Sequence, residues 1–292
     1  KLLNIDINEP KIKNHFEFWR EVDILDYTKL AHYVSNFNPT HVLHLAASLG
    51  MEHNSLDTLG TNIDGVKNII KVSNKVESIK KVVFTSSLLV CKNGYIPEDE
   101  LDYCPPNFYG ESKVLGEKLV RDSITHFNWA IVRPTSIWGP WFEYSYKTFF
   151  QTIDKNVYVH IGSKEFEKPA SYVGNTLFMM LKILFDSDTK SNKKTYYLAD
   201  YPWYSTKKWA NNIQRTLNSK NIRTSPYWLL KLGALIGDLI KLIIKKDLPL
   251  TSFRLKNMLT GGSYPLKNIK ELCPVLPYNL KKSIYITAKW MY

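Results

Sequence analysis

The residues best suited to chemistry are Tyr109 and Lys113, which stand four positions apart in Phe108-Tyr109-Gly110-Glu111-Ser112-Lys113. In a helix, this spacing puts both side chains on one face, with the ammonium beside the phenol. A tyrosine has an ordinary pKa of about 10, and a nearby cation lowers it by favouring the phenolate. The pair therefore suggests a base that works near neutral pH, although a surface pair on an amphipathic helix has the same spacing.

A hydroxyl donor, Ser87, stands at the end of the predicted buried strand that contains Val83-Phe84-Thr85-Ser86. We expect Ser87 to hold a substrate alcohol while Tyr109 removes its proton. Because a hydride must then leave the same carbon, the arrangement implies a nicotinamide cofactor. The residues thus indicate interconversion of an alcohol and a ketone.

Strands and helices alternate along the first 135 residues. Strands are expected at 2–6, 19–24, 41–47, 81–87 and 129–133, and helices at 27–37, 62–74 and 109–126. This alternation predicts a doubly wound parallel α/β sheet, Rossmann-like, in which ligands bind at the carboxyl ends of the strands. Asp6, Ala46, Ser87 and Thr135 each end a predicted strand, so we expect them to line one crevice.

After Pro140 the alternation loosens into a smaller, mainly helical C-terminal lobe. Strands are expected at 158–161 and 195–199, and helices at 172–185, 206–217, 227–244 and 280–291. We expect a cofactor-binding domain at 1–135 plus about 168–200, and a substrate-binding lobe at about 136–167 and 201–292.

The composition of the chain limits the class of protein, its location and the ligands that it could bind. With 292 residues, 44% hydrophobic and 23% charged, the chain can bury a large core. Its three cysteines show no disulfide or metal-ligand spacing, which favours a reducing, cytoplasmic location and no metal. The net charge of +12 is spread along the chain, which favours phosphate-bearing small molecules over nucleic acid.

The most apolar segment, 227–244, is interrupted by Lys231, Asp238 and Lys241, so we expect no membrane span. Its apolar residues Trp228, Leu232, Leu235, Leu239 and Leu242 recur at helical spacing. We expect a helix packed in the small lobe, with a helix lying on a membrane surface as the alternative.

Taken together, the motifs resemble the extended short-chain dehydrogenase/reductase family, which contains NAD-dependent sugar-nucleotide epimerases and dehydratases. The likeness runs over nearly the whole chain. It rests on Asp6, Asp23-Ile24, His44-Leu45-Ala46-Ala47, Asn62, Thr85-Ser86-Ser87, Tyr109 with Lys113, and the run from Arg133 to Pro140. Asn62 is expected to support the fold.

The resemblance implies NAD as the cofactor, since an acid at Asp6 bonds the adenosine ribose and disfavours the extra phosphate of NADP. It implies catalytic roles for Ser87, Tyr109 and Lys113. Implied cofactor contacts are Asp6, Asp23, Ile24, Leu45, Ala46, Ala47, Tyr109, Lys113 and Pro134, and implied substrate contacts are Ser87, Thr135, Ser136, Lys168 and Arg254. The two cations are candidates for a diphosphate, although Lys168 also fits a solvated loop lysine.

Two departures from the family pattern are informative. The acid that ends the second strand usually follows the glycine-rich phosphate loop by about 20 residues, so that loop is expected before residue 1, in a segment missing from this sequence. The alternative is a protein that cannot hold a pyrophosphate in the usual way. Ser87 is followed by Leu88-Leu89, where the 4,6-dehydratases have Asp-Glu. This difference favours an epimerase or a simple oxidoreductase over a dehydratase.

The sequence thus suggests an NAD-dependent epimerase or oxidoreductase that acts on a nucleotide-activated sugar. One alternative is a dehydrogenase or reductase of a hydroxysteroid-like or other lipophilic alcohol, with an apolar tunnel lined by Trp138, Trp141 and Phe142. Another is a non-catalytic NAD-binding protein. By resemblance, the protein is expected to form a homodimer through the helices at 62–74 and 109–126.

Overall fold

The computed structural model describes residues 1–49, 55–142, 146–162, 165, 167, 169–186, 191–244, 250–252, 255 and 264–292. The chain divides into two compact units. The first comprises Lys1–Lys92, Pro97–Pro134 and Met179–Tyr197, and the second comprises Asn93–Ile96, Thr135–Phe178 and Leu198–Tyr292.

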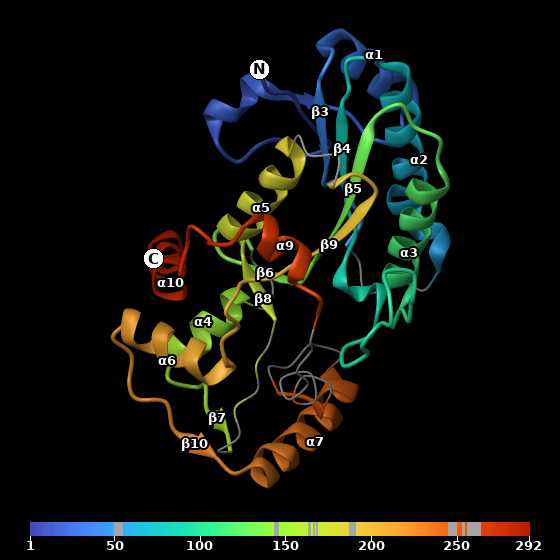
Figure 1. The fold of residues 1–292 in the computed structure, drawn as a ribbon. Helices are drawn as coiled ribbons and strands as arrows, with labels where there is room; N and C mark the ends of the chain where they lie inside the picture. Colours follow the sequence, from blue (N-terminus) through green and yellow to red (C-terminus); the bar gives the residue numbers. More distant parts are fainter. Residues whose placement is uncertain are drawn as a thin grey trace. The chain divides into compact units, whose positions relative to one another are not determined.

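The first unit is built on a four-stranded sheet in the order β3-β4-β5-β9 (Figure 1). Its strands are β3 (His41–His44), β4 (Lys81–Thr85), β5 (Asn128–Pro134) and β9 (Lys194–Leu198). The strands β3, β4 and β5 are parallel. β4 is a buried, β-branched run, as expected of a central strand covered on both faces. The prediction of a parallel α/β sheet is confirmed.

Helices α2 (Gly60–Lys75) and α3 (Phe108–Asp122) pack side by side along this sheet (Figure 1). α1 (Tyr27–Phe37) packs against α2. On the same unit, Phe185 at the end of α5 (Val173–Phe185) contacts the ring of His41 on β3. The apolar core between helices and sheet includes Leu30, Val66, Ile69, Val72, Val82, Phe84, Val120 and Ile131.

Shorter elements complete the first unit. β1 (Asn4–Asp6) pairs in parallel with β2 (Trp19–Glu21). Three short 3-10 helices cover Lys13–Phe18, Leu56–Leu59 and Leu88–Val90, and none of them is expected from the sequence. The third begins at Leu88, after Ser86 and Ser87, which follow the end of β4.

The second unit is mainly helical, as predicted. It contains α4 (Tyr146–Asp154), α6 (Thr206–Thr216), α7 (Tyr227–Ile244), α9 (Lys267–Leu272) and α10 (Leu280–Met291). β6 (Ser136–Trp138) pairs with β8 (Ala170–Tyr172), and β7 (His160–Ile161) pairs with β10 (Thr224–Ser225). Its core is aromatic and includes Trp138, Phe150, Tyr172, Tyr204 and Trp209.

The sequence prediction fails mainly in this unit. It misses α4, α9, β6, β8 and β10, and it places a strand at 158–161 where β7 covers only His160–Ile161. The α4 segment is rich in aromatic and β-branched residues, which favour strands in isolation. α9 has only 6 residues, too few to show a helical repeat. No helix among the described residues combines the length and apolar character needed to cross a membrane.

Candidate active site

Tyr109 and Lys113 lie at the start of α3, on the side that faces the sheet. The Asn107 side chain caps this helix by accepting a hydrogen bond from the Gly110 amide at 2.9 Å. Tyr109 is 9% exposed and Lys113 is 6% exposed. The cap therefore fixes the first turn, and with it the position of both side chains.

Ser87 follows the end of β4 and caps the 3-10 helix Leu88–Val90. Its Oγ accepts a hydrogen bond from the Leu89 amide at 3.1 Å. The side chains of Ser87 and Tyr109 are hydrogen-bonded to each other. The Lys113 Nζ lies 5.9 Å from the centroid of the Tyr109 ring. The fold thus brings the three residues that the sequence singles out into one cluster within the first unit.

Gly110 lets α3 approach the loop that carries Ser87. A Cβ atom at this position would overlap the carbonyl oxygen of Leu89 and lie 3.1 Å from the Cβ of Pro105. Only glycine fits without a shift of the backbone. The close approach of helix and loop is what allows the Tyr109 phenol to reach the Ser87 hydroxyl.

Lys113 is directed at the end of β4. Its Nζ donates a hydrogen bond to the Thr85 carbonyl oxygen at 3.1 Å. Burial lowers the pKa of Lys113 to about 8, while the negative charge of Glu117 acts in the opposite direction. Lys113 therefore stays mostly protonated at pH 7, and its charge remains available beside the phenol.

The pKa of Tyr109 corrects the expectation that this phenol titrates low. Burial raises its pKa above the ordinary value, and the hydrogen bond with Ser87 opposes that shift only in part. The Lys113 ammonium lies 5.9 Å from the centroid of the Tyr109 ring, and the net shift of the Tyr109 pKa is still upward. Spacing along a helix predicts the pairing but not the degree of burial.

A buried polar network that the sequence analysis missed lies on the sheet side of α3. Arg133 Nε and Nη2 donate to the carboxylate of Glu117 at 2.9 and 2.7 Å. The same carboxylate accepts from Ser86 Oγ at 2.6 Å and from the Tyr103 hydroxyl at 3.0 Å. Two sequence signals point to it: an arginine inside an apolar strand, and a glutamate four residues after Lys113.

Two further buried residues support the cluster. Asn62 on α2 accepts from the Ser48 amide at 2.8 Å and donates to Ser112 Oγ at 3.0 Å, the fold-supporting role expected of it. His44 at the end of β3 is buried, and burial together with the charge of Lys113 lowers its pKa to about 3. Both residues line a small pocket together with Ser86, Lys113 and Glu117.

The candidate cofactor residues of the first unit fit an adenosine ribose. Asp6 is exposed at the end of β1, and its Oδ1 accepts from the Asn8 amide at 2.8 Å. An exposed carboxylate at a strand end is the group that takes ribose hydroxyls. Asp23 is also exposed, and its Oδ1 accepts from the Leu25 amide at 2.9 Å.

The apolar members of the cofactor set follow β3, lie at the end of β5, or lie in the turn between β2 and α1. After β3, Leu45 is exposed and the small residues Ala46 and Ala47 are half-buried. Ile24 is buried against Gly65, and Pro134 is buried at the end of β5. Small and apolar groups of this kind suit the flat surfaces of a dinucleotide.

The residues expected to contact the substrate differ in burial, and two of them are not among the described residues. Thr135 is buried, and its Oγ1 donates to the Leu198 carbonyl oxygen at 3.1 Å, so its hydroxyl serves the fold. Ser136 is exposed and its side chain is hydrogen-bonded to Tyr146. Lys168 and Arg254 lie outside the described residues.

A lipophilic alcohol as substrate would require an apolar tunnel lined by Trp138, Trp141 and Phe142. These three side chains do not line a common tunnel as that alternative expects. Trp138 is fully buried in the aromatic core of the second unit, and its indole nitrogen donates to the Tyr204 hydroxyl at 2.8 Å. Trp141 and Phe142 are exposed instead. Among the described residues, no three His, Cys, Asp or Glu side chains are grouped to hold a metal ion.

The chain is similar in sequence to a known epimerase. The chain is 24% identical, over 97% of its length and 87% of the relative, to N-acetyl-alpha-D-glucosaminyl-diphospho-ditrans,octacis-undecaprenol 4-epimerase of Escherichia coli O157:H7.

Solved structures share the fold. The UDP-glucose 4-epimerase of Thermotoga maritima, solved with UDP-glucose, matches with a TM-score of 0.70, 16% identity, and coverage of 98% of this chain and 89% of that one. The UDP-glucose 4-epimerase of Thermus thermophilus, solved with NAD, matches with a TM-score of 0.64, 15% identity, and coverage of 94% and 84%. A sequence model of the NAD dependent epimerase/dehydratase family matches residues 5–195. The chain therefore belongs to the NAD-dependent epimerase/dehydratase family, whose enzymes use NAD, and the resemblance noted in its sequence is confirmed.

Proposed function

We propose that the protein is a 4-epimerase that inverts one ring hydroxyl of a sugar attached to a diphosphate. The observation that carries the proposal is the cluster of Ser87, Tyr109 and Lys113 in a chain of this family. The first unit holds NAD and the second unit binds the sugar. A homodimer formed through α2 and α3 stays a prediction.

The residues of the chain handle the proton. Ser87 holds the C4 hydroxyl of the sugar, and Tyr109 accepts its proton as a general base. Lys113 carries a positive charge near the ring of Tyr109, and a cation in this position favours the phenolate that forms when the proton leaves. Asp6 and Pro134 are among the residues of the first unit that would hold NAD, which would supply the hydride-transfer chemistry between the C4 alcohol and the 4-ketone. Tyr109 then gives the proton back to the new alkoxide, so the overall reaction is an isomerisation.

The residues after Ser87 favour epimerisation over loss of water. Elimination from a 4-ketone needs an acid that protonates the leaving hydroxyl. Here Leu88 is buried and Leu89 is half-buried, and neither side chain can donate a proton. The proposed reaction therefore stops at the ketone and returns to an alcohol.

We propose a polyprenol as the carrier of the diphosphate. The support is the similarity over nearly the whole chain to an epimerase named for an undecaprenol-linked sugar. A nucleotide carrier is the second candidate, favoured by the likeness to a structure that was solved with UDP-glucose. Both carriers present an anionic diphosphate, which suits a net charge of +12.

An assay on matched substrates tests the proposal. The protein in its full natural length is incubated with NAD and either N-acetylglucosaminyl-diphospho-polyprenol or UDP-N-acetylglucosamine, and the released sugars are separated by chromatography. We expect the galacto epimer from the polyprenol substrate. Turnover of the nucleotide substrate alone would identify the second candidate. No epimer from either substrate would contradict the proposed function.

A further inference from the structure

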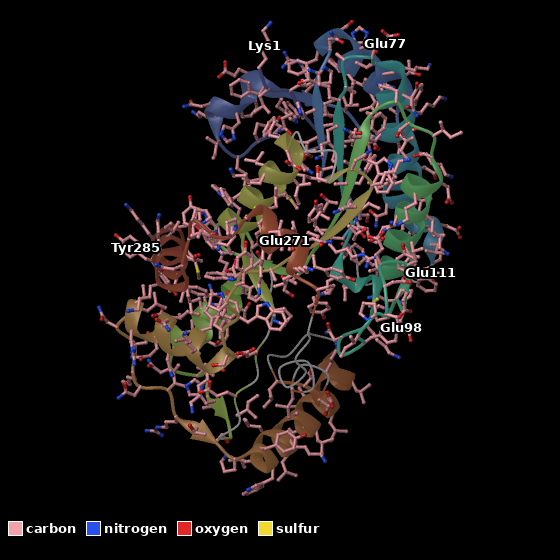
Figure 2. All side chains as sticks on the ribbon, viewed as in Figure 1. Lys1, Glu77, Glu98, Glu111, Glu271 and Tyr285 are labelled. Atoms are coloured by element: carbon pink, nitrogen blue, oxygen red, sulfur yellow. The ribbon has the colours of Figure 1, made fainter. Side chains whose placement is uncertain are left out.

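The helix α7 turns its large apolar side chains outward. Its stripe of Trp228, Leu232, Leu235, Leu239 and Leu242 is between 49% and 76% exposed. Figure 2 shows side chains standing out from α7 along its length. A surface helix of a water-soluble protein normally turns such a stripe inward. The sequence correctly predicts the helix, but the expectation that this stripe packs inside the small lobe is wrong.

Small residues on the opposite face of α7 explain the orientation. A Cβ atom on Gly237 would overlap the carbonyl oxygen of Leu250, and one on Gly233 would lie 3.1 Å from the Leu250 side chain. Ala234, on the same face, is fully buried. The helix can approach the segment around Leu250 only where side chains are absent or minimal, so its leucines must face away from that segment.

A polar contact holds the same orientation. The Asp238 carboxylate accepts a hydrogen bond from the Ser252 amide at 3.2 Å. Asp238, the acidic residue of α7, is therefore half-buried and hydrogen-bonded within the second unit. Lys231 and Lys241, the lysines of this helix, are exposed. By the helical repeat, Lys231 lies at the edge of the apolar stripe, whereas Lys241 lies toward the face that carries Gly237. The outward surface of α7 is thus an apolar stripe with one positive charge at its border.

This pattern matches a helix that lies in the surface of a membrane. Such helices bury an apolar face at the boundary between headgroups and acyl chains, while their lysines extend toward anionic headgroups. At about 1.5 Å per residue, an 18-residue helix presents such a face along its whole axis. A symmetric contact between two copies would instead bring lysine-bordered faces together, with no exposed acid on the described part of α7 to meet them.

We propose that the outward face of α7 inserts into the headgroup layer of an anionic lipid bilayer. The purpose of this contact rests on the proposed function, because a polyprenol-linked sugar is held in a membrane. The contact itself rests on α7 alone, so the two can be tested separately.

Co-sedimentation with lipid vesicles tests the contact. The protein is mixed with vesicles of phosphatidylcholine and phosphatidylglycerol, or of phosphatidylcholine alone, and the bound fraction is measured. We expect binding to the anionic vesicles. The double variant Leu232→Ser/Leu239→Ser should partition at least tenfold more weakly, which corresponds to about 1.4 kcal/mol at 25 °C. Lys231→Glu should weaken binding to the anionic vesicles more than to the neutral ones.

A matched control uses exposed apolar residues outside α7. Ile124 and Val275 are 96% and 77% exposed. The double variant Ile124→Ser/Val275→Ser removes a similar amount of apolar surface, and it should bind vesicles as the wild type does. Circular dichroism and thermal unfolding show that each variant is folded.

Three outcomes would overturn the inference. In the first, the folded wild type stays in the supernatant with every kind of vesicle. In the second, both double variants lose vesicle binding equally. In the third, the wild type does not bind vesicles and Leu232→Ser/Leu239→Ser dissociates an oligomer in light scattering, which would assign the outward face of α7 to a contact with a second copy. Epimerisation of a short-chain, water-soluble substrate is measured in parallel. Vesicle binding without epimerisation supports the α7 contact and contradicts the proposed function, and epimerisation without vesicle binding does the reverse.

Discussion

Glu117 on α3 and Arg133 on β5 form an ion pair whose side chains are 1% and 0% exposed, with Oε2 and Nη2 2.7 Å apart. The remaining guanidinium donors are also used, since Nη1 bonds the Tyr197 hydroxyl and Nη2 bonds the Glu100 carbonyl oxygen. Burial alone would lower the pKa of Arg133, but the hydrogen bonds and charge of Glu117, together with the contact to Tyr197, raise it above the ordinary value. The pair locks the helix that carries Tyr109 and Lys113 onto the sheet.

Removing one partner of this pair should destabilise the protein strongly. Glu117→Gln leaves the buried guanidinium without a counter-charge, which costs about 3–5 kcal/mol. Urea unfolding measures the loss. The control Glu111→Gln, on the same helix and half-buried, should change stability by about 0.5 kcal/mol or less. Equal effects of the two variants would contradict the assignment, and Glu117→Met/Arg133→Met should recover part of the loss.

The sequence predicts most of the first unit because strand and helix periods alternate there without interruption. It also predicts the cluster of Ser87, Tyr109 and Lys113. Tyr109 and Lys113 are spaced to share one face of a helix, and Ser87 stands at the end of a predicted strand. The pairing of Glu117 with Arg133 is harder to foresee, because the two residues lie on different elements that only the fold brings together.

Two other features depend on tertiary structure. Burial sets the pKa of Tyr109, and helical spacing says nothing about burial. The leucine repeat of α7 predicts a helix but not the direction in which the repeat points. That direction is set mainly by Gly237, where a Cβ atom would overlap the Leu250 carbonyl oxygen, while a Cβ atom at Gly233 would crowd the Leu250 side chain.

Gly110→Ala should displace the reactive phenol. The added methyl group overlaps the Leu89 carbonyl oxygen, so the first turn of α3 must move away from the loop that carries Ser87. We expect a lower kcat together with a loss of about 1–3 kcal/mol in stability. In the control Gly60→Ala, the new Cβ would lie 3.7 Å from its nearest neighbour and should be tolerated. A fully active Gly110→Ala enzyme would show that this close approach is unimportant.

Acid should destabilise the protein partly through His44. Its pKa is lowered from 6.5 to about 3 in the folded state, so the unfolded chain binds more protons between these values. The stability contributed by neutral His44 is therefore present above about pH 6.5 and is lost by about 1.4 kcal/mol per pH unit as the pH falls toward 3.

Urea unfolding midpoints measured at several pH values test this dependence. His44→Gln should flatten the acid slope, whereas His15→Gln, at an exposed position, should keep it. An unchanged slope in His44→Gln would mean that His44 is protonated in the folded protein.

The charge of Lys113 should set the pH at which the phenol works. In Lys113→Met the phenolate loses its neighbouring cation, so the pKa of Tyr109 rises further and the acid limb of the kcat profile moves to higher pH. Lys118→Met, an exposed site on the same helix, should leave the profile in place. If both variants show the wild-type limb, Lys113 does not act on the phenol.

Replacing the Tyr109 hydroxyl tests the central claim most directly. Tyr109→Phe keeps the ring and removes the atom that moves the proton, so kcat should fall by about 10²- to 10⁴-fold while the dissociation constant for NAD, measured by titration, changes little. Tyr285→Phe, at the exposed position labelled in Figure 2, should be fully active. Epimerisation by Tyr109→Phe at the wild-type rate would contradict the account.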